Sequence, residues 1–233
     1  MSGPGPAPGG GPLLAFDTSG PLGSVAVGQE GSIRATVTLA EPREHASGLV
    51  PAIARALSEA AVDRQDLAGI VVGEGPGSFT GVRVAAATAK GLAHALGVPL
   101  FAVSSLRAAA LGSDVGPIRY VLFDARGDRV YGACYGVGAV GVQRLVSPHG
   151  GTLRDALAGD VPPGAVFVGD GAEQHRSAIE GAGFEVVTTA VDHLAEGLLR
   201  AMTVPPPTEP VVDPSLWEPA YIRASSAERP WTA

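Results

Sequence analysis

The sequence is poor in cysteine, in charge and in aromatic residues, and it contains no long uninterrupted apolar run. Its single cysteine, Cys134, excludes an internal disulfide and a cage of several thiolates around a metal. The net charge is −7 and no cluster of three basic residues occurs, so strong direct binding to RNA or DNA is not expected. No membrane span or secretory leader is recognisable, which predicts a cytoplasmic protein without membrane contact.

Small apolar residues dominate what is present. Hydrophobic residues make up 45% of the 233 residues and charged residues 17%, which is typical of helices packed on a sheet. Residues 1–12 are almost entirely glycine and proline and are predicted to form a disordered tail. The proline-rich stretch that begins at residue 205 predicts a linker, and the segment up to residue 233 is expected to pack back on the N-terminal lobe.

Apolar periodicity predicts an alternation of strands and helices. Three antiparallel strands are predicted at residues 13–19, 24–28 and 32–39. A helix at residues 43–61, a buried strand at 67–73, a helix at 79–96 and a strand at 99–104 follow, and then a short helix.

The second half of the chain repeats the layout of the first. YVLFDARGDRVYGACY, residues 120–135, has the same apolar strand, Phe-Asp pair, turn and second strand as LLAFDTSGPLGSVAV, residues 13–27. Predicted elements then follow as a strand (141–146), a helix (152–158), a strand (165–170), a helix (172–181), a further strand and a helix (191–202). The duplication predicts an α/β fold with an N-terminal lobe over residues 13–105 and a C-terminal lobe over residues 106–204.

A duplicated meander whose first strand ends in aspartate resembles the actin-like (ribonuclease H-like) superfamily of sugar kinases, actin and heat-shock chaperones. The resemblance implies that the two aspartate turns face each other across a cleft and flank the phosphates of ATP. The matching residues are Asp17, Thr18, Ser19, Asp124, Gly169 and Gly171. Such residues can bind phosphate or magnesium, but they also terminate strands in ordinary turns. We therefore expect no required cofactor and at most weak binding of ATP or ADP.

The stretch GEGPGSFTG, residues 73–81, lies between the predicted buried strand and the following helix. It is neither a Walker loop nor a complete dinucleotide fingerprint, because no GxxxxGK[ST] pattern can be read and the third glycine is missing. It predicts a tight turn in which Ser78 or Thr80 caps the helix. That helix carries a face of small residues, which suits close packing against the core or against a partner.

The longer stretch GPGSFTGVRVAAATAKGLAHALGVPLFAVSSL is similar to the signature of the TsaB (YeaZ) family. LLAFDTSGPLGSVAV, EHASGLVPAI, FDARGDRVY and EPAYIR agree with further motifs of that family in order and spacing, over nearly all of residues 13–223. The resemblance implies an actin-like, non-catalytic partner of TsaD. TsaD is the paralogue that transfers threonylcarbamoyl to the adenosine beside the anticodon of tRNAs reading ANN codons.

The resemblance also implies partners. The two N-lobe helices would pair with those of TsaD, or with a second copy of this chain, while a TsaE-like ATPase joins the complex and tRNA is contacted only through it. The candidate interface residues on these helices are His45, Leu49, Ile53, Val82, Ala86, Ala89, Lys90 and Ala93.

The chain lacks the metal-binding pair of the transferase paralogue. Where that paralogue carries His-x-x-x-His, this chain has Ser105 and Ala109, neither of which binds a transition metal usefully. We therefore expect no catalytic residue and no metal. Two alternatives remain: an independent actin-like ATPase or kinase that uses the inter-lobe cleft, and a peptidase, for which Ser78 lacks the nucleophile-elbow pattern.

Overall fold

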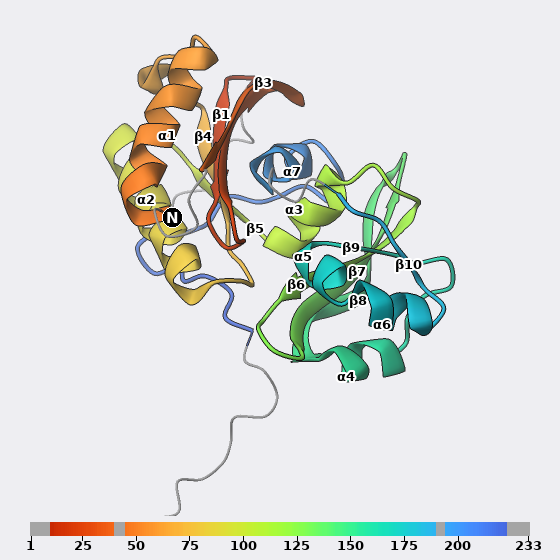
Figure 1. Ribbon diagram of the computed structural model, residues 1–233. Coiled ribbons are helices and arrows are strands. Elements are labelled where there is room, and N and C mark those ends of the chain that lie inside the picture. Colours follow the sequence, from red (N-terminus) through yellow and green to blue (C-terminus); the bar gives the residue numbers. More distant parts are fainter. Residues whose placement is uncertain (1–9, 40–44, 190–193, 223–233) are drawn as a thin grey trace, which may run out of the picture.

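Two five-stranded sheets and their helices make up the fold (Figure 1). The computed structural model describes residues 10–39, 45–189 and 194–222. The N-terminal sheet contains β1 (Leu13–Asp17), β2 (Gly23–Gln29), β3 (Ser32–Leu39), β4 (Gly69–Gly73) and β5 (Leu100–Val103). The C-terminal sheet contains β6 (Ile118–Asp124), β7 (Arg129–Gly138), β8 (Gly141–Thr152), β9 (Val166–Val168) and β10 (Glu185–Val186).

Helices connect and cover these strands. They are α1 (His45–Glu59), α2 (Phe79–Leu96), α3 (Ser105–Gly112), α4 (Leu153–Ala158), α5 (Asp170–Gln174), α6 (Arg176–Gly181) and α7 (Leu194–Ala201), with a short 3₁₀ turn η1 (Arg64–Asp66). Within the described ranges, none of these helices has both the length and the apolar character that crossing a bilayer would need.

The two sheets have the same topology. The strand order is β3-β2-β1-β4-β5 in the N-terminal sheet and β8-β7-β6-β9-β10 in the C-terminal sheet. In each, the first strand pairs antiparallel with the second and parallel with the fourth. The predicted duplication and the actin-like α/β fold are thereby confirmed.

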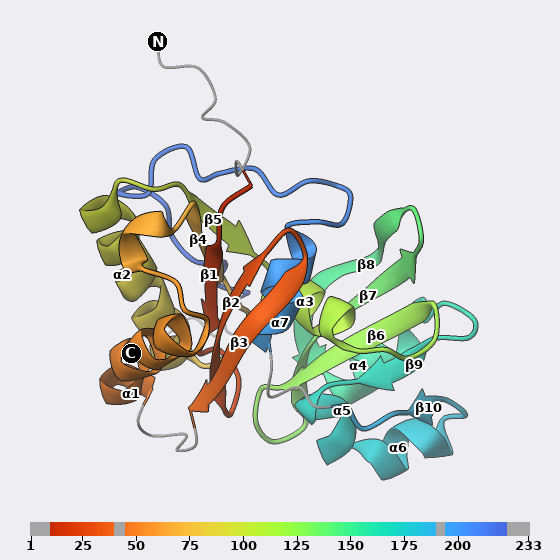
Figure 2. The same cartoon turned by 90° about the horizontal axis from the view of Figure 1, so that it is seen from above.

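Helices and sheets alternate in layers (Figures 1 and 2). The outer face of the N-terminal sheet packs against α1 and α2, and the outer face of the C-terminal sheet packs against α4, α5 and α6. Between the two sheets lie α3 and α7. Because β1 is covered on both faces, all its side chains are buried, which explains its continuous apolar run.

The two helices between the sheets, α3 and α7, contact strands of different sheets. The helix α3 contacts β6 and β7, whereas α7 contacts β1, β2 and β4. The two helices approach closely at Gly197, where a Cβ atom would lie 2.0 Å from the carbonyl oxygen of Ala108. The lobe boundary expected at residue 105 stays a prediction; α7 lies by sequence within residues 106–204 and packs on the N-terminal sheet.

The helix α2 has the bounds that the sequence predicts. The Ser78 Oγ atom accepts a hydrogen bond from the Gly81 backbone N–H at 3.3 Å, so Ser78 rather than Thr80 caps the helix. Gly97 ends it in the left-handed conformation at φ 68°.

The predictions are less accurate in the C-terminal half. The single helix predicted at residues 172–181 is two short helices, α5 and α6, because the backbone at His175 (φ −110°, ψ 18°) departs from helical geometry. The strand predicted at residues 165–170 is shortened to β9, because Gly169, at φ 106°, turns the chain directly into α5. The strand predicted at residues 141–146 instead extends to Thr152 as β8.

The C-terminal segment leaves α7 and runs along the N-terminal lobe. The Val211 backbone N–H donates to the Leu100 carbonyl at 2.8 Å, and the Ala220 N–H donates to the Glu74 carbonyl at 3.1 Å. We call residues 210–222 the C-terminal strap. Its attachment places residues from the far end of the chain beside the loop that precedes α2.

Candidate functional site

A cleft of about 520 Å³ lies between the two lobes, at the ends of β1 and β6. It is lined by Ser19, Gly20, Pro21, Gly77, Ser78, Phe79, Thr80, Phe123, Asp124, Ala125, Arg126, Tyr131 and Asp170. The cleft therefore contains Ser19 and Asp124 of the predicted nucleotide-binding residues. Asp17, Thr18, Gly169 and Gly171 do not line it.

The Asp17 carboxylate is buried inside the N-terminal lobe. One oxygen accepts a hydrogen bond from the Ser19 backbone N–H at 2.6 Å, and the other accepts from the Ser105 Oγ at 2.5 Å. The carboxylate lies so close to Gly73 that a Cβ atom there would be 1.8 Å from Asp17 Oδ2. Asp17 is 1% exposed, so it holds the β1 turn to β4 and α3 and cannot reach a ligand in the cleft.

The loop of residues 74–78 and the start of α2 close over the β1 turn. The Ser78 N–H donates to the Ser19 carbonyl at 2.8 Å, and the Thr18 hydroxyl donates to the Gly81 carbonyl at 2.6 Å. A Cβ atom at Gly77 would lie 2.4 Å from the Ser19 carbonyl oxygen, and one at Gly81 would lie 1.8 Å from the Thr18 carbonyl oxygen. Gly77 and Gly81 therefore allow the backbone of this loop and of α2 to contact the backbone of the β1 turn.

The corresponding turn of the C-terminal lobe is open. Asp124 is exposed, and its carboxylate accepts a hydrogen bond from the Arg126 backbone N–H at 2.8 Å. Asp170 lies beside it on the cleft wall. Burial raises the pKa of Asp170 to about 6; the negative charge of Asp124 also raises it, while backbone N–H groups of Asp124 and Gly171 oppose the shift.

Gly169 and Gly171 bring α5 against β6. A Cβ atom at Gly169 would lie 2.3 Å from the Leu122 carbonyl oxygen, and one at Gly171 would lie 2.6 Å from the Phe123 carbonyl carbon. Both glycines are buried by this contact. The approach of helix to strand accounts for them without a ligand, which is the packing alternative that the sequence left open.

These residues do not fit a nucleotide whose phosphates lie between two aspartate turns. Phosphate needs converging N–H groups or cations, but the N-terminal turn is covered by the chain's own backbone. The charged residues of the cleft wall are Asp124, Asp170 and Arg126, so two carboxylates oppose one guanidinium. A polyphosphate without a divalent cation would be repelled there.

Ser105 and Ala109 stand where the transferase paralogue would carry its metal ligands. Ser105 is buried, and its Oγ atom donates to Asp17 and accepts from the Gly75 N–H at 3.1 Å. Ala109 is buried in the core between the sheets. In the part of the chain that the structure describes, no three His, Cys, Asp or Glu residues gather as a metal site would require. Sequence reasoning did not foresee the structural role of Ser105, because the contact with Asp17 spans the lobe.

Six of the eight predicted interface residues are buried in the chain's own core. Less than a tenth of each of the following is exposed: Leu49, Ile53, Val82, Ala86, Ala89 and Ala93. Apolar periodicity marks the side of a helix that faces its own sheet, so the prediction selected the inner sides of α1 and α2. Lys90 is half-buried, and its Nζ atom donates to the Ser215 carbonyl at 3.2 Å. His45 begins α1, but its side chain lies outside the described part.

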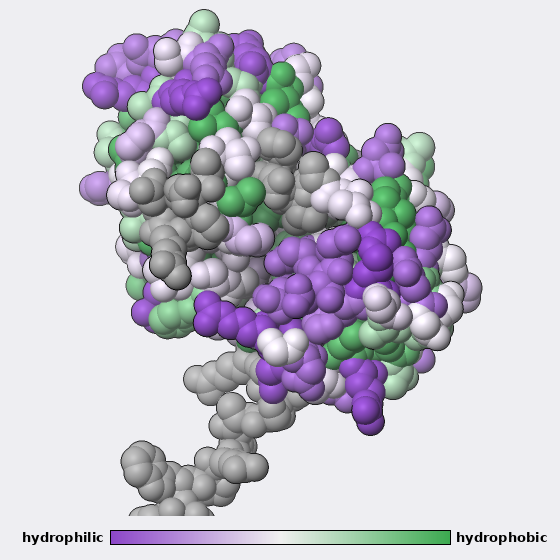
Figure 3. All heavy atoms as spheres, viewed as in Figure 1, coloured by the Kyte–Doolittle hydropathy of each residue, from purple (hydrophilic) through white to green (hydrophobic). Residues whose placement is uncertain are grey.

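The outer sides of α1 and α2 carry a different set of small residues. On α1, Val50 is 62% exposed, and Ala54 follows it one turn later. On α2, Arg83, Ala87 and Gly91 are exposed at successive turns. We call these five residues the helical face. Hydrophilic residues gather over α5 and α6, whereas the side formed by α1 and α2 is mixed in character (Figure 3).

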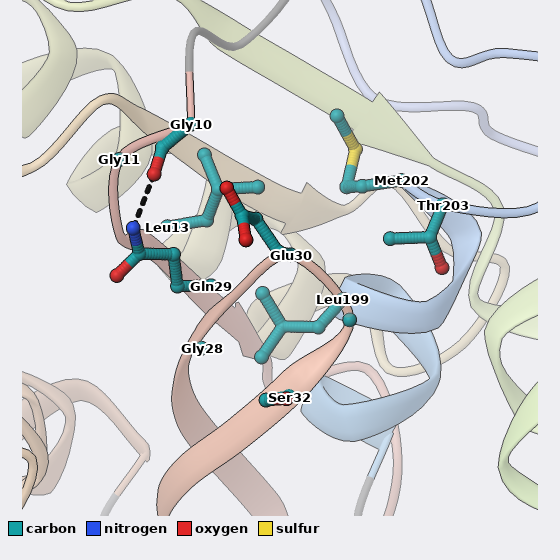
Figure 4. A pocket seen from close by; sticks show the side chains of 11 residues that line it. Gly10, Gly11, Leu13, Gly28, Gln29, Glu30, Ser32, Leu199, Met202 and Thr203 are labelled. Carbon is teal, nitrogen blue, oxygen red and sulfur yellow. Dashed lines mark hydrogen bonds between the residues drawn. The ribbon is translucent and has the colours of Figure 1, made fainter.

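A smaller pocket of about 130 Å³ lies far from the inter-lobe cleft, where α7 meets the turn between β2 and β3 (Figure 4). Leu13, Leu199 and Met202 line it together with several glycines, and Glu30 is its single charged residue. The Gln29 side chain donates to the Gly10 carbonyl, which fixes this part of the predicted tail; residues 1–9 of that tail lie outside the described residues. The pocket contains no group of catalytic side chains.

Comparisons with known proteins agree on one family. Residues 35–228 match the family model described as TsaD, tRNA N6-adenosine threonylcarbamoyltransferase. The tRNA threonylcarbamoyladenosine biosynthesis protein TsaB of Bacillus subtilis is 31% identical over 94% of this chain and 97% of its own. Escherichia coli TsaB is 36% identical over 53% of this chain and 54% of its own. The structure of YeaZ from Pseudomonas aeruginosa superposes with a TM-score of 0.73 at 27% identity, covering 91% of this chain and all of that one.

Proposed function

The chain belongs to the TsaB (YeaZ) family, and from this premise we propose that it is a non-catalytic scaffold in the complex that installs N6-threonylcarbamoyladenosine on tRNA. Relatives of this family are named as tRNA threonylcarbamoyladenosine biosynthesis proteins, and this chain takes part in the same biosynthesis. The finer proposal is that it binds and activates a TsaD-like transferase acting on tRNAs that read ANN codons.

The observation that carries the proposal is the contrast between the cleft and the helical face. The β1 turn is filled by the chain itself, and two carboxylates face one guanidinium in the cleft, which disfavours nucleotide chemistry. The helical face exposes Val50, Ala54, Ala87 and Gly91 on two adjacent helices. Small side chains let helices of another protein approach closely, as in ridge-into-groove packing.

The same face would serve a second copy of this chain, so a homodimer and the complex with the transferase would exclude each other. A TsaE-like ATPase would join through the complex. The net charge of −7 favours holding tRNA through the other subunits. We propose that the chain needs no cofactor of its own, binds ATP or ADP weakly at most, and works in the cytoplasm.

Light scattering after size-exclusion chromatography of this chain mixed with its cognate transferase tests the proposal. The wild-type mixture should give a stable complex. Ala87→Arg, which places a long charged side chain on the helical face, should lower the affinity at least about tenfold. Ala178→Arg is the matched control, because Ala178 is an exposed helical alanine of α6 in the other lobe.

Absence of a wild-type complex, together with ATP hydrolysis by the isolated chain, would contradict the scaffold role and favour an independent actin-like ATPase. Equal loss of binding by Ala87→Arg and Ala178→Arg would remove the helical face from the proposal.

A further inference from the structure

A groove of about 460 Å³ lies where the start of α2, the strand β7 and the C-terminal strap meet. We call it the aromatic groove; it is lined by Pro76, Gly77, Phe79, Val82, Arg83, Tyr131, Ala220, Tyr221 and Ile222. Phe79 is 58% exposed and Tyr221 is 44% exposed. Two large exposed rings side by side are notable in a chain whose aromatic content is only 5%.

Arg83 lies over the Phe79 ring and beside Tyr221, and the two rings contact each other with centroids 5.7 Å apart. Its guanidinium carbon lies 3.8 Å from the centroid of the Phe79 ring and 5.9 Å from that of Tyr221. Its Nε atom donates to the Tyr221 hydroxyl at 3.2 Å. Among the described residues no carboxylate forms an ion pair with Arg83, and none lines the groove. The terminal N–H groups of the guanidinium are therefore oriented in advance for an acidic group.

The strap that supplies Tyr221 is anchored to Glu74 just before it reaches the groove. Trp217 donates a hydrogen bond to the half-buried Glu74 carboxylate, and the Ala220 N–H donates to the Glu74 carbonyl at 3.1 Å. The Lys90 Nζ atom lies 5.9 Å from the centroid of the Trp217 ring. A groove whose walls are fixed in this way loses little conformational entropy when it is occupied.

Motifs from distant parts of the sequence meet at this groove. Phe79 and Arg83 come from GPGSFTGVR, Tyr131 comes from FDARGDRVY, and Tyr221 comes from EPAYIR. The fold does not require the two exposed rings for burial, so their convergence needs another reason. Arg83 also lies on the outer side of α2, one turn before Ala87, so the groove continues the helical face.

We propose that the aromatic groove is an anchor site for the transferase partner, which packs an apolar side chain against the two contacting rings and places a neighbouring carboxylate on Arg83. This inference rests on the proposed scaffold function. Exposed Phe, Tyr and Arg residues in a preformed pocket are the composition of interface hot spots. Arg83 is the one cation among the described residues that line the groove, which favours an acidic partner segment. The continuity of the groove with the helical face favours the same partner.

Titration calorimetry of the full chain with its cognate transferase tests the anchor. Phe79→Ala, Tyr221→Ala and Arg83→Glu should each weaken binding about tenfold or more, while Arg83→Lys should retain more of the affinity than Arg83→Glu. The Arg83→Gln variant should also show a weaker dependence of affinity on salt than the wild type, because an ion pair is lost. Leu216→Ala and Arg154→Glu, which change exposed residues outside the groove, should bind like the wild type.

The outcomes separate the anchor from the scaffold. Wild-type affinity of all the groove variants, with binding still abolished by Ala87→Arg, would overturn the anchor and leave the scaffold in place. A wild-type chain that does not bind the transferase would overturn both. Tighter binding of the transferase by a chain that ends at Ile222 would assign the groove to the residues that follow Ile222. Groove variants that change only self-association would assign it to a second copy of this chain. Either result would overturn the proposal.

Discussion

The two aspartate turns occupy equivalent places in the duplicated fold, but their surroundings differ. Asp17 ends β1 and is 1% exposed, while Asp124 ends β6 and is exposed. The cause is the connection that follows the fourth strand of each sheet. Residues 74–78 separate β4 from α2 and cover the first turn, whereas Gly169 alone separates β9 from α5 and leaves the second turn open.

This difference shows how one copy of a duplicated fold can cover its aspartate turn while the other copy keeps its turn open. The short connection preserves an open cleft wall in the C-terminal lobe. The longer one fills the N-terminal turn and, by starting α2 farther along the chain, presents Phe79 and Arg83 beside the C-terminal strap. One loop therefore covers the first turn and also shapes the groove that we propose as a partner-binding site.

Disrupting the contact that covers the β1 turn should have the largest effect on the free energy of unfolding. In Gly81→Ala the new Cβ atom would lie 1.8 Å from the Thr18 carbonyl oxygen, and because both are backbone positions we expect a loss of roughly 3 kcal/mol or more in the free energy of unfolding. Gly91→Ala, at an open position of the same helix, should stabilise by up to about 1 kcal/mol. Urea denaturation measures both, and similar stability of the two variants would contradict the close contact.

Replacing each aspartate by alanine tests directly whether the two turns are differently buried. Asp17→Ala leaves the Ser19 N–H and the Ser105 hydroxyl without their buried partner, and should cost about 2–3 kcal/mol. Asp124→Ala removes one exposed hydrogen bond and should cost about 1 kcal/mol or less. Equal losses in thermal or chemical unfolding would show that the two turns are not differently buried.

Asp170 gives the open turn a dependence on pH. Its pKa is raised from 3.8 to about 6 in the folded chain, so the folded state binds the proton more tightly than the unfolded state does. The free energy of unfolding should therefore fall as pH rises between these values. Asp170→Asn should gain on the order of 1–2 kcal/mol at about pH 7.5 and little at about pH 4. A gain that is the same at both pH values would contradict the burial of a titrating carboxyl.

Local patterns and the repeat were enough to predict the fold and the bounds of α2. Ser78 and Gly97 are strong end signals, and the Phe-Asp turns recur because the topology does. The same patterns selected residues that are buried in the chain's own core, since apolar periodicity reports the side of α1 and α2 that their own sheet covers. They also could not foresee the contacts of Ser105 with Asp17 or of Tyr221 with Arg83. Those pairs are far apart in sequence and meet only through tertiary packing.

The most direct test of the account is tRNA threonylcarbamoylation by the reconstituted transferase system, with variants of this chain that alter either the helical face or the cleft. The account predicts that Ala87→Arg fails to support modification, whereas the double variant Asp124→Ala/Asp170→Asn supports it like the wild type. Full activity with Ala87→Arg and none with the cleft variant would contradict the account and return the function to the inter-lobe cleft.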